Sequence, residues 1–195
     1  TFTQARFHPK TFLSPEEVDG SSTWIDLFRA DTNGDFRKDY RIATFGLGEI
    51  WSNGGNVVGF QNLFGYDPIA LQSYTSLLSR VVGKFERTPA FNTAPDVHAA
   101  ILDAASMKYL FIHDELKATE KVVFRPDQYT FVGKSRGVEG YLNRKFIPRA
   151  SIVPRTLILP PSIPATDFMA SPAFVPSEMA VVGHSEAQGV PEGLA

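Results

Sequence analysis

The sequence predicts an α+β fold: a mixed, largely antiparallel β-sheet with two or three helices packed on it and extended N- and C-terminal arms. Helical patterns gather in the first half of the chain, whereas short β-prone runs separated by turn residues fill the second half. Ordinary hydrophobic (43%) and charged (21%) contents indicate a globular core within 195 residues. We therefore predict an N-terminal arm (1–20), a single domain (21–182) and a C-terminal tail (183–195).

The first half of the domain is predicted to run from helix to strand, loop and second helix. Residues 23–30 carry an apolar helical stripe, and 40–45 form a short β-prone run. The stretch 53–65 is rich in glycine and asparagine, which tolerate positive φ, so it is predicted to be a tightly turned loop. Asp67-Pro68 then supplies an N-cap and a first helical residue. The apolar stripe of this second helix is Ile69, Leu71, Tyr74, Leu77 and Leu78. Such an order is typical of a binding surface and equally of a chain that turns a corner.

The second half is predicted to be a helix followed by an antiparallel meander. Pro95-Asp96 begins a helix that runs to about Ala105. Its inward residues are Val97, Ala100, Ile101 and Ala104. The apolar run 107–113 predicts a strand that is buried on both faces. Short turns separate the strands predicted after it, which are 121–125, 129–133, 138–143 and 150–159. A helical turn at 166–170 and a last strand at 179–183 follow a run of prolines.

Both ends of the chain are expected to rest on another surface. The arm has large apolar residues without clear periodicity, and the tail is poor in them, so neither is expected to order by itself. That surface is either a partner or the chain's own body. Aromatic side chains bury a large area per residue, so the predicted partner contacts of the arm are Phe2, Phe7, Phe12 and Leu13.

Charge and cysteine content exclude several classes of function. A net charge of −2 and a pI near 6.1 give no basic field for nucleic acid or anionic lipid. The chain has no cysteine, which excludes disulfides and thiolate metal sites. No apolar run approaches the roughly 20 residues that span a bilayer. Because the chain begins at Thr1 without a methionine or a signal-peptide pattern, we expect a processed protein or part of a longer one.

Three polar patterns imitate ligand sites but are better explained as local structure. Asp31-x-Asn33-x-Asp35 begins like a calcium loop, yet its sixth position is Phe36 and its twelfth is Ile42, so an Asx-rich turn is expected. Gly46-Leu47-Gly48 and Gly54-Gly55 fit no phosphate-binding motif. Metal-ligand spacing is absent from the histidines, which are His8, His98, His113 and His184. We expect neither a metal nor a cofactor.

A basic stretch late in the chain is the remaining ligand candidate. Arg149 and Arg155 flank a predicted strand segment and would suit an anionic lipid or a sugar phosphate. Such residues also form ion pairs along a sheet edge or discourage edge pairing. Tyr66, just before the second helix, is a further candidate ligand residue, whereas the N-cap role explains its neighbour Asp67.

Four ordered segments between about Arg41 and Val182 resemble the extracytoplasmic domain of the YfhO-like bacterial membrane proteins. The patterns are R-[IV] followed by an asparagine-bearing loop and G-Y-[DHS] with a later tyrosine, then [KR]-Y-[LIV], Y-x-N with [LI]-P-R-A, and P-x-F-[DV]-P before V-V. The matching residues are Arg41-Ile42, Asn53 or Asn56, Gly65-Tyr66-Asp67, Tyr74, Met107–Leu110, Tyr141–Asn143, Ile147–Ala150 and Phe168–Val182. The family's membrane-embedded helices and the β-sandwich that usually follows the last motif are missing here.

The resemblance implies a periplasmic location, on the extracytoplasmic face of a bacterial membrane. YfhO-like proteins resemble C-type glycosyltransferases, which take a sugar from a polyprenyl-phosphate carrier and hold their catalytic carboxylate between transmembrane helices. No catalytic residue is therefore expected in this chain. The first hypothesis is an extrinsic accessory subunit that binds and stabilises a larger membrane-protein complex, of respiratory or photosynthetic type. The alternative is the excised soluble domain of a polyprenyl-phosphate-sugar-dependent membrane glycosyltransferase.

Overall fold

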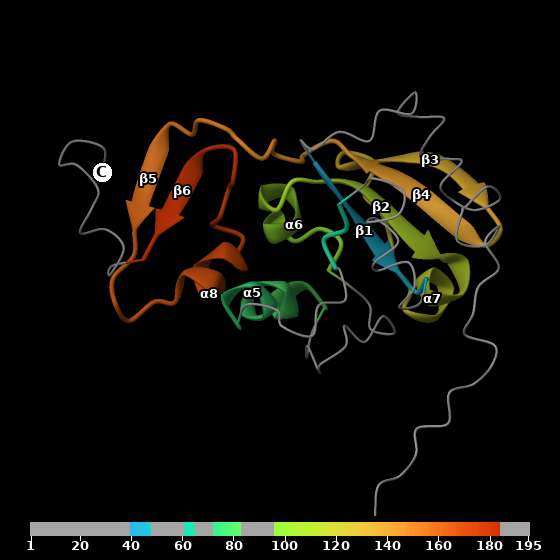
Figure 1. The fold of residues 1–195 in the computed structure, drawn as a ribbon, viewed down its shortest axis with the longest axis horizontal. Helices are drawn as coiled ribbons and strands as arrows, with labels where there is room; N and C mark the ends of the chain where they lie inside the picture. The colour runs from blue at the N-terminus through green and yellow to red at the C-terminus, as the bar shows by residue number, and fades with distance from the viewer. Residues whose placement is uncertain (1–39, 48–60, 65–71, 83–95, 184–195) are drawn as a thin grey trace, which may run out of the picture.

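The computed structural model describes residues 40–47, 61–64, 72–82 and 96–183. Within these ranges the chain forms a four-stranded sheet of order β1-β2-β4-β3 and a two-stranded sheet of β5 and β6 (Figure 1). The predicted α+β class with a mixed, mostly antiparallel sheet is confirmed. The arm, the helix predicted at 23–30, the glycine-rich loop and the tail beyond Gly183 lie outside the described residues, except for 61–64 at the end of that loop.

The four-stranded sheet combines one parallel pair with two antiparallel pairs. Its strands are β1 (Arg41–Phe45), β2 (Met107–His113), β3 (Tyr129–Ser135) and β4 (Val138–Asn143). β1 runs parallel to β2, and β4 runs antiparallel to both β2 and β3. The expected meander is wrong, because β4 and not β3 lies beside β2. β4 lies between two strands and is buried at four of its six positions, whereas β3 lies at the edge and is buried only at Tyr129.

A two-residue turn fixes the β3–β4 hairpin. Arg136 and Gly137 have φ of 47° and 77°, the left-handed values that a type I′ turn requires at both central positions. A side chain at Gly137 would also approach His113 and Asp114. Glycine is therefore favoured here both by the positive φ and by the lack of space for a Cβ atom. The turn lies within the predicted 134–137 segment, and β3 continues two residues beyond its predicted end.

Helices α5 (Gln72–Val82) and α6 (Ala100–Ala104) contribute the main core with the sheet. Leu78 of α5 and Ile101 of α6 are fully buried, as the apolar spacing predicted, whereas Tyr74 of the same predicted stripe as Leu78 is 36% exposed. α6 starts later than expected, because residues 97–98 form a turn before it. Alternate residues of β2 supply both faces of the sheet, so Leu110 joins this main core and Phe111 joins a smaller cluster on the opposite face.

The strand predicted at 121–125 is wrong, and a helix stands just before it. α7 (Asp114–Thr119) follows β2 directly and begins where His113 Nδ1 accepts the Glu115 N–H at 3.3 Å. Acidic residues fill its first turn and Lys117 its last, which suits the helix dipole. Residues 121–125 then pack onto the sheet instead of joining it, and the Phe124 ring stacks on the Tyr141 ring at 3.7 Å.

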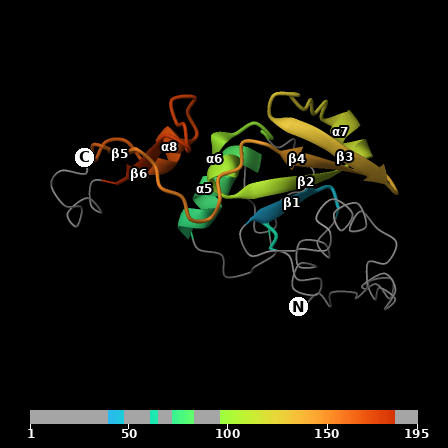
Figure 2. The same cartoon turned by 90° about the horizontal axis from the view of Figure 1, so that it is seen from above.

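The C-terminal unit comprises β5 (Arg155–Ile158), α8 (Ala165–Met169) and β6 (Met179–Val182). The predicted strand 150–159 is shortened at its start, because Pro154 has no N–H for a ladder. The helical turn and the last strand lie close to where they were predicted. β5 and β6 pair in parallel, with Leu157 opposite Val181, and α8 lies on the connection between them. Figures 1 and 2 show this unit beyond α5 and α6, away from the four-stranded sheet. An ion pair between Arg80 of α5 and Asp167 of α8 joins the unit to the body.

Candidate functional site

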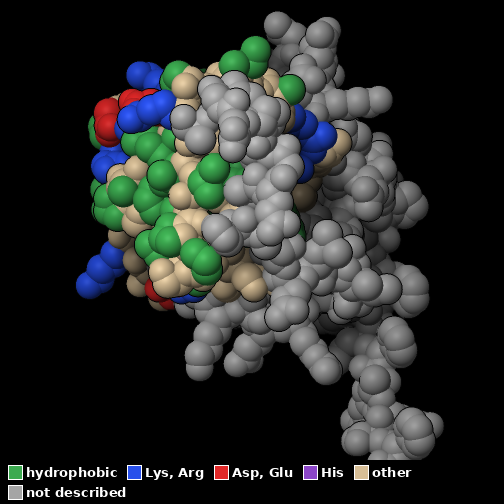
Figure 3. Space-filling view, turned by 90° about the vertical axis from the view of Figure 1, so that its left-hand side faces the viewer, with side chains coloured by type: hydrophobic (Ala, Val, Ile, Leu, Met, Phe, Trp, Pro, Cys, Tyr) green, Lys and Arg blue, Asp and Glu red, His purple; other side chains and the backbone are tan. Residues whose placement is uncertain are grey.

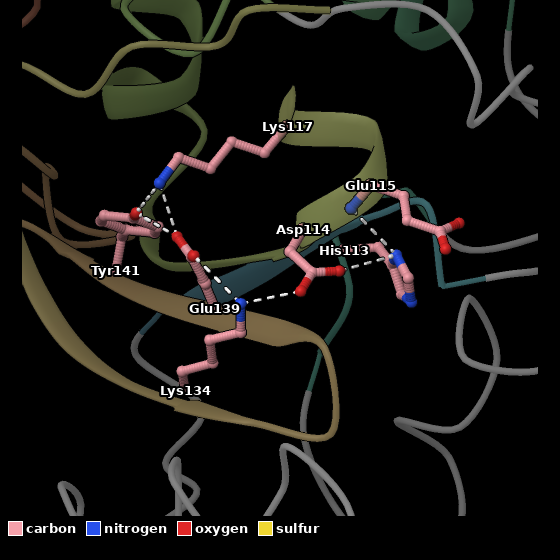
Figure 4. Close-up of polar contacts among 7 residues, drawn as sticks. All are labelled: His113, Asp114, Glu115, Lys117, Lys134, Glu139 and Tyr141. Atoms are coloured by element: carbon pink, nitrogen blue, oxygen red, sulfur yellow. Dashed lines mark hydrogen bonds and ion pairs between the residues drawn. The ribbon is translucent and has the colours of Figure 1, made fainter. Parts of the chain in front are cut away.

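A polar network connects α7 to the hairpin of β3 and β4 (Figure 4). Lys117 Nζ donates to Glu139 Oε2 at 2.6 Å and to the Tyr141 hydroxyl at 2.7 Å. The Tyr141 hydroxyl in turn donates to the same Glu139 oxygen at 2.6 Å. All three side chains are partly buried, so these charge-assisted bonds are less screened than bonds on an open surface.

The network continues to the end of β2. Lys134 Nζ lies 2.7 Å from Asp114 Oδ2 and 3.7 Å from Glu139 Oε1. His113 Nδ1 lies 3.4 Å from Asp114 Oδ1. The hydrogen bond from Lys134 lowers the pKa of Asp114, and the same bond raises the pKa of Lys134. His113 therefore caps α7, and Asp114 pairs with Lys134.

Lys117, Glu139 and Tyr141 each keep one ionisation state at neutral pH. Burial acts to raise the pKa of Glu139, but hydrogen bonds from Lys117 and Tyr141 outweigh it and the pKa is lowered. Burial would lower the pKa of Lys117, yet the bonds to Glu139 and Tyr141 raise it. Burial raises the pKa of Tyr141 further above its ordinary value. These three shifts all move away from neutrality, so the cluster suits fastening of α7 to the sheet better than proton transfer.

The C-terminal parallel pair is the second notable feature, and we call it the β5–β6 surface (residues 155–158 and 179–182). Its residues are half-exposed at every position except the exposed Arg155. They are apolar except for Arg155 and Thr156. Figure 3 views the molecule from the side on which β5 and β6 lie in Figure 1, and hydrophobic side chains gather on that face among a few charged ones. Three of the six exposed large hydrophobics of the described residues lie in or beside the same unit, namely Ile152, Ile163 and Val175.

A parallel pair of this kind is incomplete as a sheet. Parallel strands are normally covered on both faces and belong to larger sheets. A lone two-stranded sheet is marginal in water. Within the described part of the chain, β5 and β6 pair only with each other, so each strand keeps one edge without a ladder. The arrangement can accept another strand and an apolar cover.

The predicted ligand arginines have separate partners. Arg155 Nη2 lies 2.7 Å from Glu178 Oε2, an exposed ion pair beside the start of β5 and β6. Arg149 donates to the Gln61 side chain and lies before β5 rather than on a strand. Anion binding at these two arginines stays a prediction. Tyr66 and the aromatic arm residues, Phe2, Phe7, Phe12 and Leu13, lie outside the described residues.

Three residues that sequence reasoning missed form a buried polar group under α6. Asp103 Oδ1 accepts from Asn143 Nδ2 at 2.6 Å and from Gln128 Nε2 at 3.3 Å. Asn143 also donates to the Met107 carbonyl at 3.0 Å and accepts from Lys145 N at 3.0 Å. The only signal in the sequence was an aspartate directly after two apolar helix residues, Ile101 and Leu102.

The fold and these contacts define an α+β domain with an incomplete second sheet. Comparisons of this chain with protein-family models, with curated proteins and with solved structures find no match. Among the residues that the structure describes, no helix combines the length and apolar character needed to cross a membrane. The same residues include no group of three or more histidine or acidic side chains placed to hold a metal ion. The calcium-like stretch at 31–42 falls almost wholly outside them.

Proposed function

We propose that this chain is a non-catalytic accessory domain, located on the extracytoplasmic face of a bacterial membrane, that binds subunits of a larger membrane-protein complex. The observation that carries the proposal is the β5–β6 surface, where largely apolar strands are half-exposed and each has one edge that no other described strand pairs with. A protein partner that adds a strand and buries this face would gain both ladder hydrogen bonds and apolar contact. The four segments that resemble YfhO-like proteins support the location.

The fixed charges of the α7 network support the non-catalytic part of the proposal. Lys117 and Glu139 hold their charges and Tyr141 holds its proton across the neutral range. Their bonds are to one another, across the contact between α7 and β4. A group that gives and takes protons near neutral pH would need a pKa close to that range.

The alternative, the soluble domain of a polyprenyl-phosphate-sugar-dependent glycosyltransferase, uses the same surface. In that case the polypeptide that completes β5 and β6 belongs to the same gene product. The resemblance to YfhO-like proteins would favour this alternative if the gene also encodes membrane helices next to this segment. If the gene does encode them, the chain is an enzyme domain and the accessory-subunit proposal is wrong.

The test is co-purification of the full chain with membrane subunits of its own organism. Val181→Lys places a charge on β6 and is expected to abolish co-purification while leaving the unfolding temperature nearly unchanged, because Val181 is only half-buried. The matched control is Phe131→Lys, which puts the same charge at an exposed aromatic on the edge strand of the other sheet. Retained co-purification of Val181→Lys, or a loss in the control alone, would refute a role for the β5–β6 surface.

A further inference from the structure

A cavity of about 450 Å³ lies at the junction between the body and the C-terminal unit. Asp103, Arg125 and Gln128 line its polar side, and Pro172, Phe174 and Pro176 line its apolar side. Figure 1 shows α6, which carries Asp103, standing between the four-stranded sheet and the C-terminal unit. A volume of this size suits a small molecule, and mixed walls with a few convergent polar groups are typical of ligand sites.

Asp103 brings a buried negative charge with half of its hydrogen-bonding capacity unused. The residue is only 6% exposed. Its Oδ1 accepts from both Asn143 and Gln128, whereas no donor among the described residues bonds to Oδ2. No cation among those residues pairs with it. Burial raises the pKa of this carboxyl, opposed by the two amide hydrogen bonds and, more weakly, by the charges of Lys145 and His98 at longer range. A buried carboxylate oxygen without a donor is costly, and a ligand donor would relieve that cost.

Arg125 brings a positive charge to the same cavity, also without a counter-ion among the described residues. Its Nε donates to His98 Nδ1 at 3.2 Å and its Nη2 to Gln128 Oε1 at 3.0 Å. His98 Nε2 lies 2.9 Å from the Val123 carbonyl, and its Nδ1 lies 2.9 Å from Gln128 Oε1, so the imidazole contacts both the arginine and the glutamine. These bonds fix the guanidinium with donors to spare.

The Gln128 side chain holds the two opposite charges at a set distance. Its Nε2 donates to Asp103 and its Oε1 accepts from Arg125, so one amide group separates the carboxylate from the guanidinium. Gln128 is itself buried. The other charged residues of the walls are already engaged in part, because Lys145 pairs with Asp127 at 3.1 Å and Asp96 Oδ1 accepts the His98 N–H at 3.1 Å.

We propose that this cavity binds a small zwitterion, with the ligand's ammonium group on Asp103 and its carboxylate on Arg125. An anion without an ammonium would meet Asp103 and Asp96, and a cation without a carboxylate would meet Arg125. A zwitterion can form an ion pair with both residues at once. Asp103 is buried at the wall of the cavity whereas Arg125 is exposed at it, so the contact to the ligand's ammonium is less screened by solvent than the contact to its carboxylate.

The test is calorimetric titration of the full chain with glycine, β-alanine and γ-aminobutyrate, which carry the same two charges at increasing separation. One member of the series is expected to bind, and its N-acetyl and amide derivatives to bind roughly tenfold to a hundredfold more weakly. Absence of binding by all three at millimolar concentration, or equal binding of the derivatives, overturns the proposal.

Two variants sharpen the test. Arg125→Gln removes the exposed guanidinium charge and is expected to weaken binding of the parent zwitterion at least about tenfold but not binding of its amide. Asp103→Asn is expected to do the reverse, with the N-acetyl derivative unaffected. If Asp103→Asn does not fold, Arg125→Gln decides alone. Arg155→Gln removes an arginine of the β5–β6 surface and serves as the matched control, with unchanged affinity. Undiminished affinity in Arg125→Gln, or an equal loss in the control, contradicts the assignment.

Discussion

The two sheets of this molecule differ in how many of their strand edges are paired and in how deeply their apolar residues are buried. In the four-stranded sheet, β2 has partners on both edges and its residues from Tyr109 to Ile112 are all buried. In the two-stranded sheet, each strand has one partner and its apolar residues are half-exposed. Both have the composition of buried strands. The difference teaches that an apolar strand is buried only where neighbouring elements cover it, and the described residues cover β2 more fully than they cover β5 and β6.

The junction between the two regions combines polar contacts with apolar packing, because Met169 of α8 packs against the main core. Asp103, Gln128 and Asn143 fasten α6 to the ends of β3 and β4. Arg80 and Asp167 then join α5 to α8 across the boundary. The first sheet is therefore held by packing and buried hydrogen bonds, whereas the C-terminal unit is joined to the body by an exposed ion pair and by Met169 of α8, which packs against the edge of the main core. Substitutions in the two regions are expected to act on stability with very different size.

The largest difference is expected from truncation of apolar side chains. Phe111→Ala removes a fully buried ring from β2 and should lower the free energy of unfolding by about 3–5 kcal/mol. Val181→Ala on β6 should cost about 1 kcal/mol or less, because the side chain is only half-buried. Urea denaturation of both variants checks the contrast. Equal losses would show that the β5–β6 surface is as well packed as β2.

The buried polar group should come next in size. Asn143→Ala removes the shorter of the two side-chain hydrogen bonds to Asp103 and the side-chain donor to the Met107 carbonyl, and it should cost about 1–3 kcal/mol. Arg144→Ala, at the adjacent exposed position, should stay within about 0.5 kcal/mol. Both values come from denaturant midpoints at one pH. If Asn143→Ala lowers the free energy of unfolding no more than Arg144→Ala does, water makes the hydrogen bonds of the missing amide at no cost.

The pH dependence of stability should have opposite signs for two carboxyl groups. The pKa of Glu139 is lowered in the folded chain, so its contribution is complete above the ordinary glutamate range and is lost as the pH falls through the lowered value. The pKa of Asp103 is raised, so its ionisation costs the folded state stability as the pH rises from the ordinary aspartate range through the raised value.

This pair is tested by the unfolding midpoints of the wild type, Glu139→Gln and Asp103→Asn. The midpoints are measured from about pH 3 to about pH 7, the range in which carboxyl groups titrate. The advantage of the wild type over Glu139→Gln should shrink toward low pH. Its advantage over Asp103→Asn should shrink toward high pH. The same trend in both variants would contradict one of the two assignments.

The smallest effect is expected at the ion pair of Arg155 and Glu178. Both side chains are more than half exposed, so solvent and salt screen the attraction. Arg155→Ala should change the free energy of unfolding by less than about 1 kcal/mol, and 0.5 M salt should remove the change. A larger, salt-resistant loss would indicate that this end of the β5–β6 surface is less exposed in solution.

Elements with a strong local signal could be predicted from the sequence. β2 and β4 match their predicted bounds, because apolar runs end at clear turn residues. α7 could not be predicted in the same way: Asp114 to Thr119 has no apolar stripe, and its start depends on a cap from His113. The parallel pairing of β5 with β6 joins segments about twenty residues apart, which no local pattern encodes.

The polar groups were harder to predict than the strands. Asp103 reads as the outer face of a helix in the sequence, and it is buried because Asn143, forty positions later, supplies the donor. Arg125 and Gln128 lie in a segment where the sequence indicated only a strand end and a turn. The cavity that they line exists only once residues 170–176 pack against them. Contacts between distant segments create such sites, and spacing along the chain does not reveal them.

Amide hydrogen exchange, measured on the isolated chain and on the chain bound in its native membranes, tests the central claim most directly. The account predicts rapid exchange in β5 and β6 of the isolated chain, slow exchange in β2 and β4, and a gain of protection on binding that is confined to β5 and β6. Protection of β5 and β6 in the isolated chain equal to that of β2 and β4, unchanged in the membrane sample, would contradict it.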